Sequence, residues 1–222
     1  MNIWEARWLV IDTETTGIDT TTAAIVELAA VPFDRGRPGA RMGRLINPGI
    51  PIPEQASAVH GITDAMVARE SRIEDVAERF LDHVDEAEVL VGYNFLCYDE
   101  PILSRSLGVA WDEATAGKPV IDPLVIVRLD AVGRYWRGPG RHRLTSVCAR
   151  LGIRCPGQAH RASADCLMTG ALLWHLRTHP GCQHLPVDAH EADAWLHRQA
   201  AAQEENYQRW RASQPPQSGG GA

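Results

Sequence analysis

The chain has 222 residues, of which 45% are hydrophobic, and a formal net charge of −6. This length suits one domain with a full core plus appendages, and it argues against two domains of similar size. No stretch approaches the roughly 20 uninterrupted apolar residues of a membrane span. The start, MNIWEARW, lacks the basic-then-apolar pattern of a signal peptide. We therefore expect a cytoplasmic protein that does not act in a membrane, and the negative charge excludes polyanion binding by bulk electrostatics alone.

The first third of the chain predicts an antiparallel meander. Runs of apolar and β-branched residues predict strands at 7–12, 23–34 and 40–47, separated by turn residues. A Pro-rich loop follows at 47–55. Apolar residues at helical spacing then predict an amphipathic helix over 73–84.

Strands and helices alternate from residue 88 onward. Two further strands are predicted at 88–94 and 118–122. The predicted helices cover 99–107, 123–130, 143–152 and 161–179, the last of them stopped by Pro180. This alternation predicts an α/β fold in which helices flank a mixed five-stranded sheet.

The end of the chain changes in composition. Residues 188–212 are polar and alanine-rich, which predicts a helix with a thin apolar stripe, and 213–222 should be disordered. We expect a domain over 1–180, a helical extension over 181–212 and a disordered tail. The extension could dock on the core or on a partner protein.

Two acidic residues stand where the first strand ends. Side chains alternate along a strand, so Asp12 and Glu14 share one face with Trp8 and Val10. An isolated pair of this kind also fits the start of a solvated turn, so its meaning depends on acids elsewhere in the chain.

Two further acids are candidates for the same site. Asp165 shares a helical stripe with Met168 and Leu172, the face that should meet the core. A buried carboxylate needs a cation or a hydrogen-bond network, and backbone amides are the alternative partner. Asp99, which precedes Pro101, also fits the N-cap of a helix.

His160 precedes the helix that carries Asp165. A neutral imidazole is well matched to taking a proton from water at physiological pH, although a loop histidine can equally be a surface residue. If the four acids converge, like charges ~4 Å apart cost about 4 kcal/mol per pair. Divalent cations relieve that cost, and oxygen-only ligands favour Mg²⁺ or Mn²⁺ over zinc.

Three short motifs, IDTETTG, GYNFLCYD and HRASAD, resemble in order and spacing the exonuclease motifs of the DEDDh branch of DnaQ-like 3′–5′ exonucleases. The segments INPGIPIPEQASAVHGITDAMV and VIDPLVI resemble other parts of that family, and the resemblance spans about residues 7 to 178. It implies an RNase H-like fold, two Mg²⁺ or Mn²⁺ ions, and release of nucleoside 5′-monophosphates from a 3′ end.

The resemblance also assigns roles by position. The metal ligands would be Asp12, Glu14, Asp99 and Asp165, with Asp12 bridging both ions, and His160 would be the general base. The residues expected to hold the terminal nucleotide are Thr13, Thr15, Thr16, His60 and Asn94.

The second motif departs from the family pattern. Asp99 lies five residues after Asn94, where epsilon-like members have four, and Tyr98 stands where phenylalanine is usual. The longer spacing resembles exonuclease one and the proofreading domains of family B polymerases. These differences bear on the subgroup and leave the acidic residue in place.

A basic and aromatic segment, GRYWRGPGRHRL, interrupts the acidic chain. Its arginines could contact phosphates while Tyr135 and Trp136 stack on bases, and an ordinary solvated loop is the alternative. The candidate nucleic-acid contacts are Arg134, Arg137, Arg141 and Arg143.

The sequence therefore predicts a metal-dependent 3′–5′ exonuclease that acts on single-stranded 3′ ends, of DNA more than of RNA, in DNA repair or replication. An RNA-processing exoribonuclease or an oligoribonuclease is the enzymatic alternative. A module that binds nucleic-acid 3′ ends without cleaving them is the non-enzymatic one.

Overall fold

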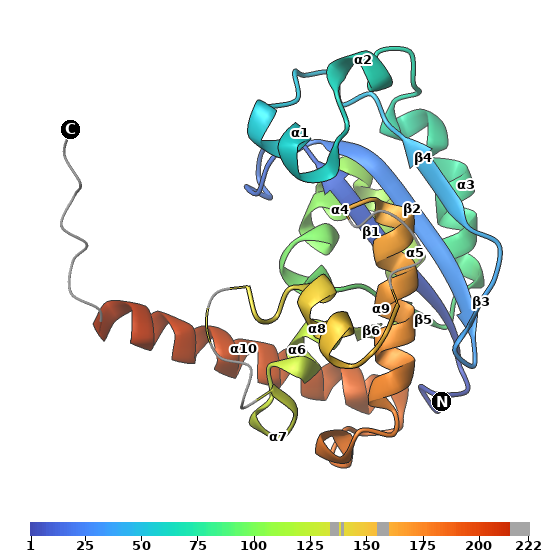
Figure 1. The fold of residues 1–222 in the computed structure, drawn as a ribbon. Helices are drawn as coiled ribbons and strands as arrows, with labels where there is room; N and C mark the ends of the chain where they lie inside the picture. The colour runs from blue at the N-terminus through green and yellow to red at the C-terminus, as the bar shows by residue number, and fades with distance from the viewer. Residues whose placement is uncertain (134–137, 139, 155–159, 214–222) are drawn as a thin grey trace.

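A computed structural model describes residues 1–133, 138, 140–154 and 160–213. No helix within those ranges is both long and apolar enough to cross a membrane. Figure 1 shows a curved sheet with helices on both faces and a long C-terminal helix that leaves the body.

The sheet is mixed, as predicted. Its order is β3-β2-β1-β5-β6, and β4 also pairs with β2. Strand β2 is antiparallel to β1, β3 and β4, whereas β5 is parallel to β1 and β6, so the predicted meander is confirmed. The strands are β1 (Arg7–Thr15), β2 (Ile25–Asp34), β3 (Arg37–Pro38), β4 (Met42–Leu45), β5 (Val89–Val91) and β6 (Val120–Ile121). The described residues form six strands rather than five, because Arg37–Pro38 pairs with β2 inside the segment predicted as a turn.

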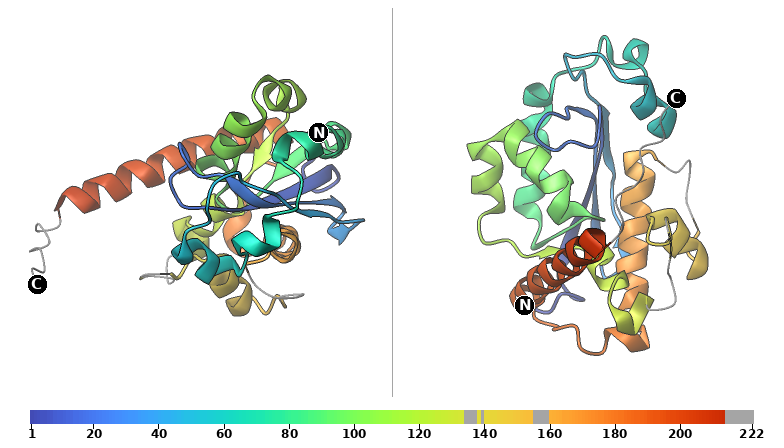
Figure 2. Two further views of the ribbon diagram at one scale, coloured as in Figure 1. Left: turned by 90° about the horizontal axis from the view of Figure 1, so that it is seen from above. Right: turned by 90° about the vertical axis from the view of Figure 1, so that its left-hand side faces the viewer.

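Strand β1 lies at the centre of the sheet and contributes side chains to two hydrophobic cores. Its side chains alternate, so Trp8 and Val10 join one core, and Leu9 and Ile11 join the other. The second core is covered by α3 (Ile73–Glu86), α4 (Asp99–Leu107) and α5 (Val109–Thr115), on the opposite side of the sheet from α9 (Ala162–Leu176), as Figure 2 shows.

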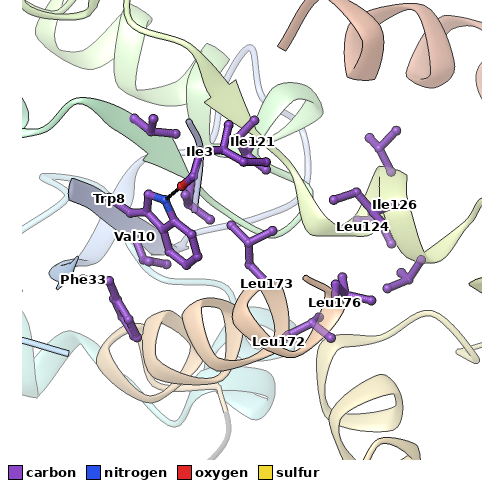
Figure 3. Close-up of a cluster of buried hydrophobic side chains, with 14 of the residues drawn as sticks. Ile3, Trp8, Val10, Phe33, Ile121, Leu124, Ile126, Leu172, Leu173 and Leu176 are labelled. Atoms are coloured by element: carbon purple, nitrogen blue, oxygen red, sulfur yellow. Dashed lines mark hydrogen bonds between the residues drawn. The ribbon is translucent and has the colours of Figure 1, made fainter. Parts of the chain in front are cut away.

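Helix α9 packs directly on the sheet. A Cβ atom on Gly170 would meet the ring of Phe33 at 2.3 Å, so only glycine allows this close approach to β2. Figure 3 shows Leu172, Leu173 and Leu176 of α9 in the core that also holds Trp8. The Trp8 indole N–H donates to the Ile3 carbonyl oxygen at 2.6 Å, which satisfies the polar atom of this buried ring.

The remaining helices join and flank these layers. They are α1 (Glu54–His60), α2 (Asp64–Val67), η1 (Phe95–Cys97), α6 (Pro123–Val127), α7 (Asp130–Gly133), α8 (Leu144–Arg150), η2 (Pro180–Cys182) and α10 (Ala189–Ser213). The helix predicted over 123–130 is divided into α6 and the start of α7, and α1, α2 and α5 were not predicted. The disordered tail was predicted over 213–222; Ser213 instead ends α10, and residues 214–222 lie outside the described residues.

Candidate active site

Strand β1 delivers two acids to one face of the sheet. The β1–β2 ladder pairs Asp12 with Ala29 and Glu14 with Glu27, so regular pairing continues to the end of the acidic pair. Asp12 and Glu14 therefore point to the face on which α9 packs, and the alternative of a solvated turn is wrong.

Helix α9 contributes the third acid. Asp165 is 9% exposed and shares its face with the buried Met168 and Leu172, which confirms the predicted core-facing stripe. One carboxylate oxygen each from Asp12, Glu14 and Asp165 lie within 4.8 Å of one another. Buried Oδ1 of Asp165 has no hydrogen-bond partner among the described residues. A bound cation would supply the partner that this oxygen lacks.

The fourth acid, Asp99, adjoins this group from the other layer. It is the first residue of α4, and Tyr98 occupies the N-cap position, so Asp99 is not the helix cap. Its Oδ1 accepts hydrogen bonds from the backbone nitrogen of Thr13 at 3.0 Å and from the Thr13 hydroxyl at 2.6 Å. Thr13 thereby ties α4 to the strand that carries Asp12.

The four carboxyl groups hold protons more tightly than free side chains do. Burial, followed by repulsion from Asp99 and Asp165, raises the pKa of Asp12 well above its usual range. Burial is also the main cause at the other three positions, and it raises the pKa to about 8 for Glu14, about 7 for Asp99 and about 6 for Asp165. A buried cluster of oxygen ligands with unfavourable negative charge fits a divalent cation of the Mg²⁺ type.

His160 lies at the mouth of this acidic group. It precedes α9, is exposed, and adopts a left-handed backbone conformation with φ 60°. Such a conformation is uncommon for a residue with a side chain. A positive charge on its ring would lower the pKa of Asp165, and the hydrogen bond from its backbone N–H also lowers it, which partly offsets the effect of burial. His160, Asp12 and Asp165 line one cavity of about 680 Å³, which we call the central cavity.

The predicted nucleotide-binding threonines hold the turn after β1. Thr15 Oγ1 donates to the Gly17 carbonyl at 2.8 Å, and Thr16 Oγ1 accepts from the backbone nitrogen of Ala24 at 3.0 Å. Thr15 and Thr16 line a second cavity of about 540 Å³ beside Glu14, which we call the side cavity.

His60 lies in the wall of the side cavity, with both ring nitrogens in use. Nδ1 accepts from the backbone nitrogen of Ile62 at 3.0 Å, so Nε2 carries the proton and faces the Thr15 carbonyl at 3.3 Å. Burial lowers the pKa of His60, which favours this neutral form. The ring nitrogens of His60 thus maintain the cavity wall in this structure.

Asn94 is positioned by a residue that we did not predict. It has φ 66°, and its backbone nitrogen donates to Asp122 Oδ1 at 3.0 Å. The same oxygen accepts from the backbone nitrogen of Leu124 at 2.9 Å, so Asp122 also caps α6. Burial raises the pKa of Asp122 to about 6. An aspartate before Pro123 at the end of a strand was the available sequence signal for this cap.

Tyr98 gives the second motif a polar contact that phenylalanine would lack. Its hydroxyl donates to the Gly17 carbonyl at 2.8 Å and also contacts Thr15 Oγ1. The departure from the family pattern therefore links α4 to the turn after β1.

A partly buried ion pair connects α9 to the sheet, and sequence reasoning missed it. Arg161 Nη2 and Nε lie 2.7 and 3.1 Å from the two carboxylate oxygens of Glu27. The Ala162 backbone nitrogen donates to the same carboxylate at 3.0 Å. Glu27 is 5% exposed and faces Glu14 across the strand ladder. This pair places the first turn of α9, including Asp165, beside β1.

The basic segment is described only in part. Arg134 and Arg137 lie outside the described residues. Arg141 and Arg143 are exposed, and Arg143 lines the central cavity while Arg141 does not.

Comparisons with known proteins agree with this geometry. The sequence profile of the family described as Exonuclease matches residues 9–173. The chain is similar to the DNA polymerase III subunit epsilon-like protein of Rhodobacter capsulatus, with 38% identity over 166 residues that cover 73% of this chain and 22% of that protein. It is also similar to the DNA polymerase III subunit epsilon of Aquifex aeolicus, with 28% identity over 77% of this chain and 80% of that protein.

Among several relatives, the chain spans only a small part of the whole protein. It matches 12% of the PolC-type DNA polymerase III of Oceanobacillus iheyensis, at 32% identity. The structure resembles Exonuclease X in complex with 5′ overhanging duplex DNA, with a TM-score of 0.62, 29% identity and coverage of 85% of this chain and 99% of that one. It shares its fold with E. coli Exonuclease I bound to an oligonucleotide, with a TM-score of 0.67, 20% identity and coverage of 78% of this chain and 41% of that one.

The profile match covers both strand-borne acids and Asp165 and extends over most of the chain. The protein belongs to the exonuclease family, in its DnaQ-like branch.

Proposed function

We propose that this chain is a metal-dependent 3′–5′ exonuclease that removes nucleoside 5′-monophosphates from single-stranded DNA ends. The observation that carries the proposal is the convergence of Asp12, Glu14 and Asp165, with ligand atoms within 4.8 Å of one another and one buried Asp165 oxygen unsatisfied. Two of these acids lie on a strand and one on a helix. All three are negative when ionised, so they repel one another and cannot neutralise their own charge.

In this proposal Asp12, Glu14, Asp165 and the adjoining Asp99 would hold two Mg²⁺ or Mn²⁺ ions. When bound, such ions neutralise the carboxylates, acidify a water molecule and stabilise the charge that develops on the phosphate and the leaving oxygen. The acidic donor set supports oxygen-preferring ions of this class.

His160 acts as the general base in this proposal. It lines the central cavity with Asp12 and Asp165, and its exposed ring can exchange protons with solvent. The ring takes a proton from the attacking water as the water approaches the terminal phosphodiester in line. The new bond from the water oxygen to phosphorus replaces the bond to the 3′ oxygen of the preceding nucleotide. That oxygen takes up a proton from solvent, and the ring returns its own proton to solvent.

The terminal nucleotide occupies the side cavity. The walls of this cavity are formed by Thr15, Thr16 and His60, and its neighbour Glu14 belongs to the acidic group. Thr13 contributes indirectly, through its hydrogen bonds to Asp99. Asn94, which lines the central cavity, contacts the DNA strand. In this proposal the scissile phosphate lies between the side cavity and His160.

DNA is favoured over RNA as the substrate by the relatives and neighbours. The epsilon subunits belong to DNA polymerases, and the Exonuclease X structure is a complex with DNA. An exoribonuclease or oligoribonuclease activity is the alternative, and a cytoplasmic location remains a prediction.

The test is hydrolysis of end-labelled single-stranded DNA and RNA of matched sequence, with Mg²⁺ and with EDTA. We expect successive shortening from the 3′ end that needs Mg²⁺ and is faster on DNA. Asp12→Asn should abolish it, because the variant removes a cation ligand while relieving repulsion in the fold. His160→Ala should slow it about 10²- to 10⁴-fold, as expected for loss of a general base.

Matched controls are available on the surface. Asp34→Asn, at the exposed end of β2, and His184→Ala should both retain full activity. Activity that persists in EDTA or in Asp12→Asn would refute the metal mechanism. Binding of DNA without any hydrolysis under all conditions would favour the 3′-end binding module.

A further inference from the structure

A basic groove continues from the central cavity toward the C-terminal helix. It has a volume of about 700 Å³. Its lining includes Arg128 after α6, Arg141 and Arg143 before α8, and Gln203 and Tyr207 of α10. We call this feature the arginine groove.

The three cavities adjoin one another in series. The side cavity and the central cavity share Ile18 and Val59, and the central cavity and the arginine groove share Asn94 and Arg143. A strand whose last nucleotide lies in the side cavity would cross the acidic group and continue past Asn94 into the arginine groove.

The charge of the arginine groove is opposite to that of the acidic group. Arg128, Arg141 and Arg143 are all exposed, and among the described residues none of them is in an ion pair. The carboxylates in its lining are the exposed Glu204 and the buried Asp122, whose Oδ1 already accepts two backbone hydrogen bonds. In a chain of net charge −6, this local excess of arginine suits a polyanion.

The far wall of the arginine groove is formed by α10 through Gln203, Glu204 and Tyr207. Figure 1 shows that the C-terminal part of this helix leaves the body. Gln203 Nε2 donates to the Val125 carbonyl at 2.9 Å, which fixes α10 against α6 at this point. Beyond it, Tyr207 is 50% exposed and stacks on Trp210 with ring centroids 5.9 Å apart. An exposed tyrosine beside arginines provides a surface for base stacking.

We propose that the arginine groove binds the single-stranded DNA segment upstream of the reacting end. Arg128 and Arg141 contact its phosphates, and Tyr207 of α10 stacks on one of its bases. The inference rests on the proposed function for the direction of the strand. It assigns a substrate-binding role to the C-terminal extension.

The test measures DNA binding apart from hydrolysis, in the Asp12→Asn background so that the strand stays intact. Fluorescence anisotropy gives the Kd for a trinucleotide and for a single strand of about 12 nucleotides, within the usual site sizes of such grooves. Adding Tyr207→Ala should raise the Kd for the long strand at least about 5-fold, the effect of losing one base stack. Adding Arg128→Gln should reduce the slope of log K against log salt by about 0.7, the value for one phosphate contact.

Two matched controls lie on the same helix, outside the arginine groove. Trp210→Ala breaks the same aromatic stack as Tyr207→Ala, and Arg209→Gln removes one exposed positive charge. Both should leave the Kd and the salt slope unchanged. If Tyr207→Ala and Trp210→Ala weaken binding equally, or if Arg128→Gln leaves the salt slope unchanged, the arginine groove does not bind the strand. Hydrolysis by the otherwise wild-type chain is scored separately, so failure of the exonuclease proposal would be recognised independently.

Discussion

Thr13 shows how a residue beside the acids can orient one of them through hydrogen bonds. Its backbone nitrogen and hydroxyl both donate to Asp99 Oδ1 and keep that carboxylate against β1. Hydrogen bonds to the charged form lower the pKa of Asp99, although burial raises it to about 7 overall. Thr13 therefore helps Asp99 to remain ionised and oriented.

Replacing Thr13 by valine tests this role. Thr13→Val removes the hydroxyl donor at nearly constant volume, so Asp99 should become harder to ionise and should bind cations less well. We expect a 10- to 100-fold loss of Mg²⁺ affinity, the usual effect of removing a partner of a metal ligand. Titration calorimetry with Mg²⁺ measures it, and Thr13→Ser, which keeps the hydroxyl, is the control. Equal losses in the two variants would show that the methyl group, and not the hydrogen bond, is responsible.

The raised pKa values of the acids predict a pH-dependent stability. In the metal-free protein the pKa is about 8 for Glu14 and about 7 for Asp99, whereas both groups ionise near pH 4 in an unfolded chain. The folded state thus retains protons that the unfolded chain releases. The stability from these groups is fully present below about pH 4 and is lost as the pH rises through 7 and 8.

We therefore expect the Tm in EDTA to fall between about pH 5 and about pH 8, and Mg²⁺ to raise the Tm more at the higher pH. Thermal unfolding followed by circular dichroism measures both effects. The Asp12→Asn variant serves as a comparison, because it lacks one of the repelling charges and should lose less stability over this range. An equal effect of Mg²⁺ at the two pH values would contradict the raised pKa values.

At the scale of elements, the ion pair between Glu27 and Arg161 joins β2 to the start of α9. Arg161→Met should leave the Glu27 carboxylate, which is 5% exposed, with only the Ala162 N–H as a partner. We expect a loss of about 3 kcal/mol in the free energy of unfolding, at the low end for breaking a buried pair because the Arg161 side chain is 36% exposed.

Urea denaturation of three variants isolates this pair. The double variant Glu27→Gln/Arg161→Met should be more stable than Arg161→Met, because it leaves no unpaired buried charge. Arg209→Met, which breaks an exposed pair with Glu205, should cost less than about 1 kcal/mol. If the double variant is the least stable of the three, the main role of Arg161 is not to offset the cost of burying the Glu27 charge.

The same elements show what the sequence could predict. Local patterns predicted α3, α4 and α10 to within two residues and the start of β1, because alternation and helical spacing are properties of neighbouring residues. Strand β1 was predicted to end at residue 12 and in fact continues to Thr15. The sequence also predicted that the acids converge on Asp12, from the strand and helix faces on which they lie and from the family motifs. The pair between Glu27 and Arg161 did not, because its partners are 134 residues apart and only the packing of α9 on β2 brings them together. Helices α1, α2 and α5 were missed because they are short and their apolar residues cover less than a full stripe.

At the scale of the whole molecule, the C-terminal helix has two parts with different roles. Its first part contributes Ala189, Ala192 and Leu196 to the core that contains Trp8 and Leu173, whereas its last turns, from Glu204 onward, are exposed. The predicted boundary at residue 180 therefore falls within a chain segment that shares one hydrophobic core with β1 and α9. Docking on the core, one of the two expectations for the extension, is confirmed for its first part.

This division predicts that the extension unfolds together with the domain. Leu196 is fully buried, so Leu196→Ala should destabilise the whole protein by about 2–5 kcal/mol, through lost burial and the cavity left behind. Tyr207 is 50% exposed, so Tyr207→Ala should change stability by less than about 0.5 kcal/mol.

Urea unfolding should be monitored by tryptophan fluorescence, which reports largely on the core, and by far-ultraviolet circular dichroism, which reports on all helices. If α10 belongs to the same cooperative unit, the two signals will coincide in the wild type and shift together in Leu196→Ala. The opposite result would be a separate early transition in circular dichroism that is the only one affected by Leu196→Ala. It would show that the extension unfolds independently, as the predicted boundary at residue 180 implies.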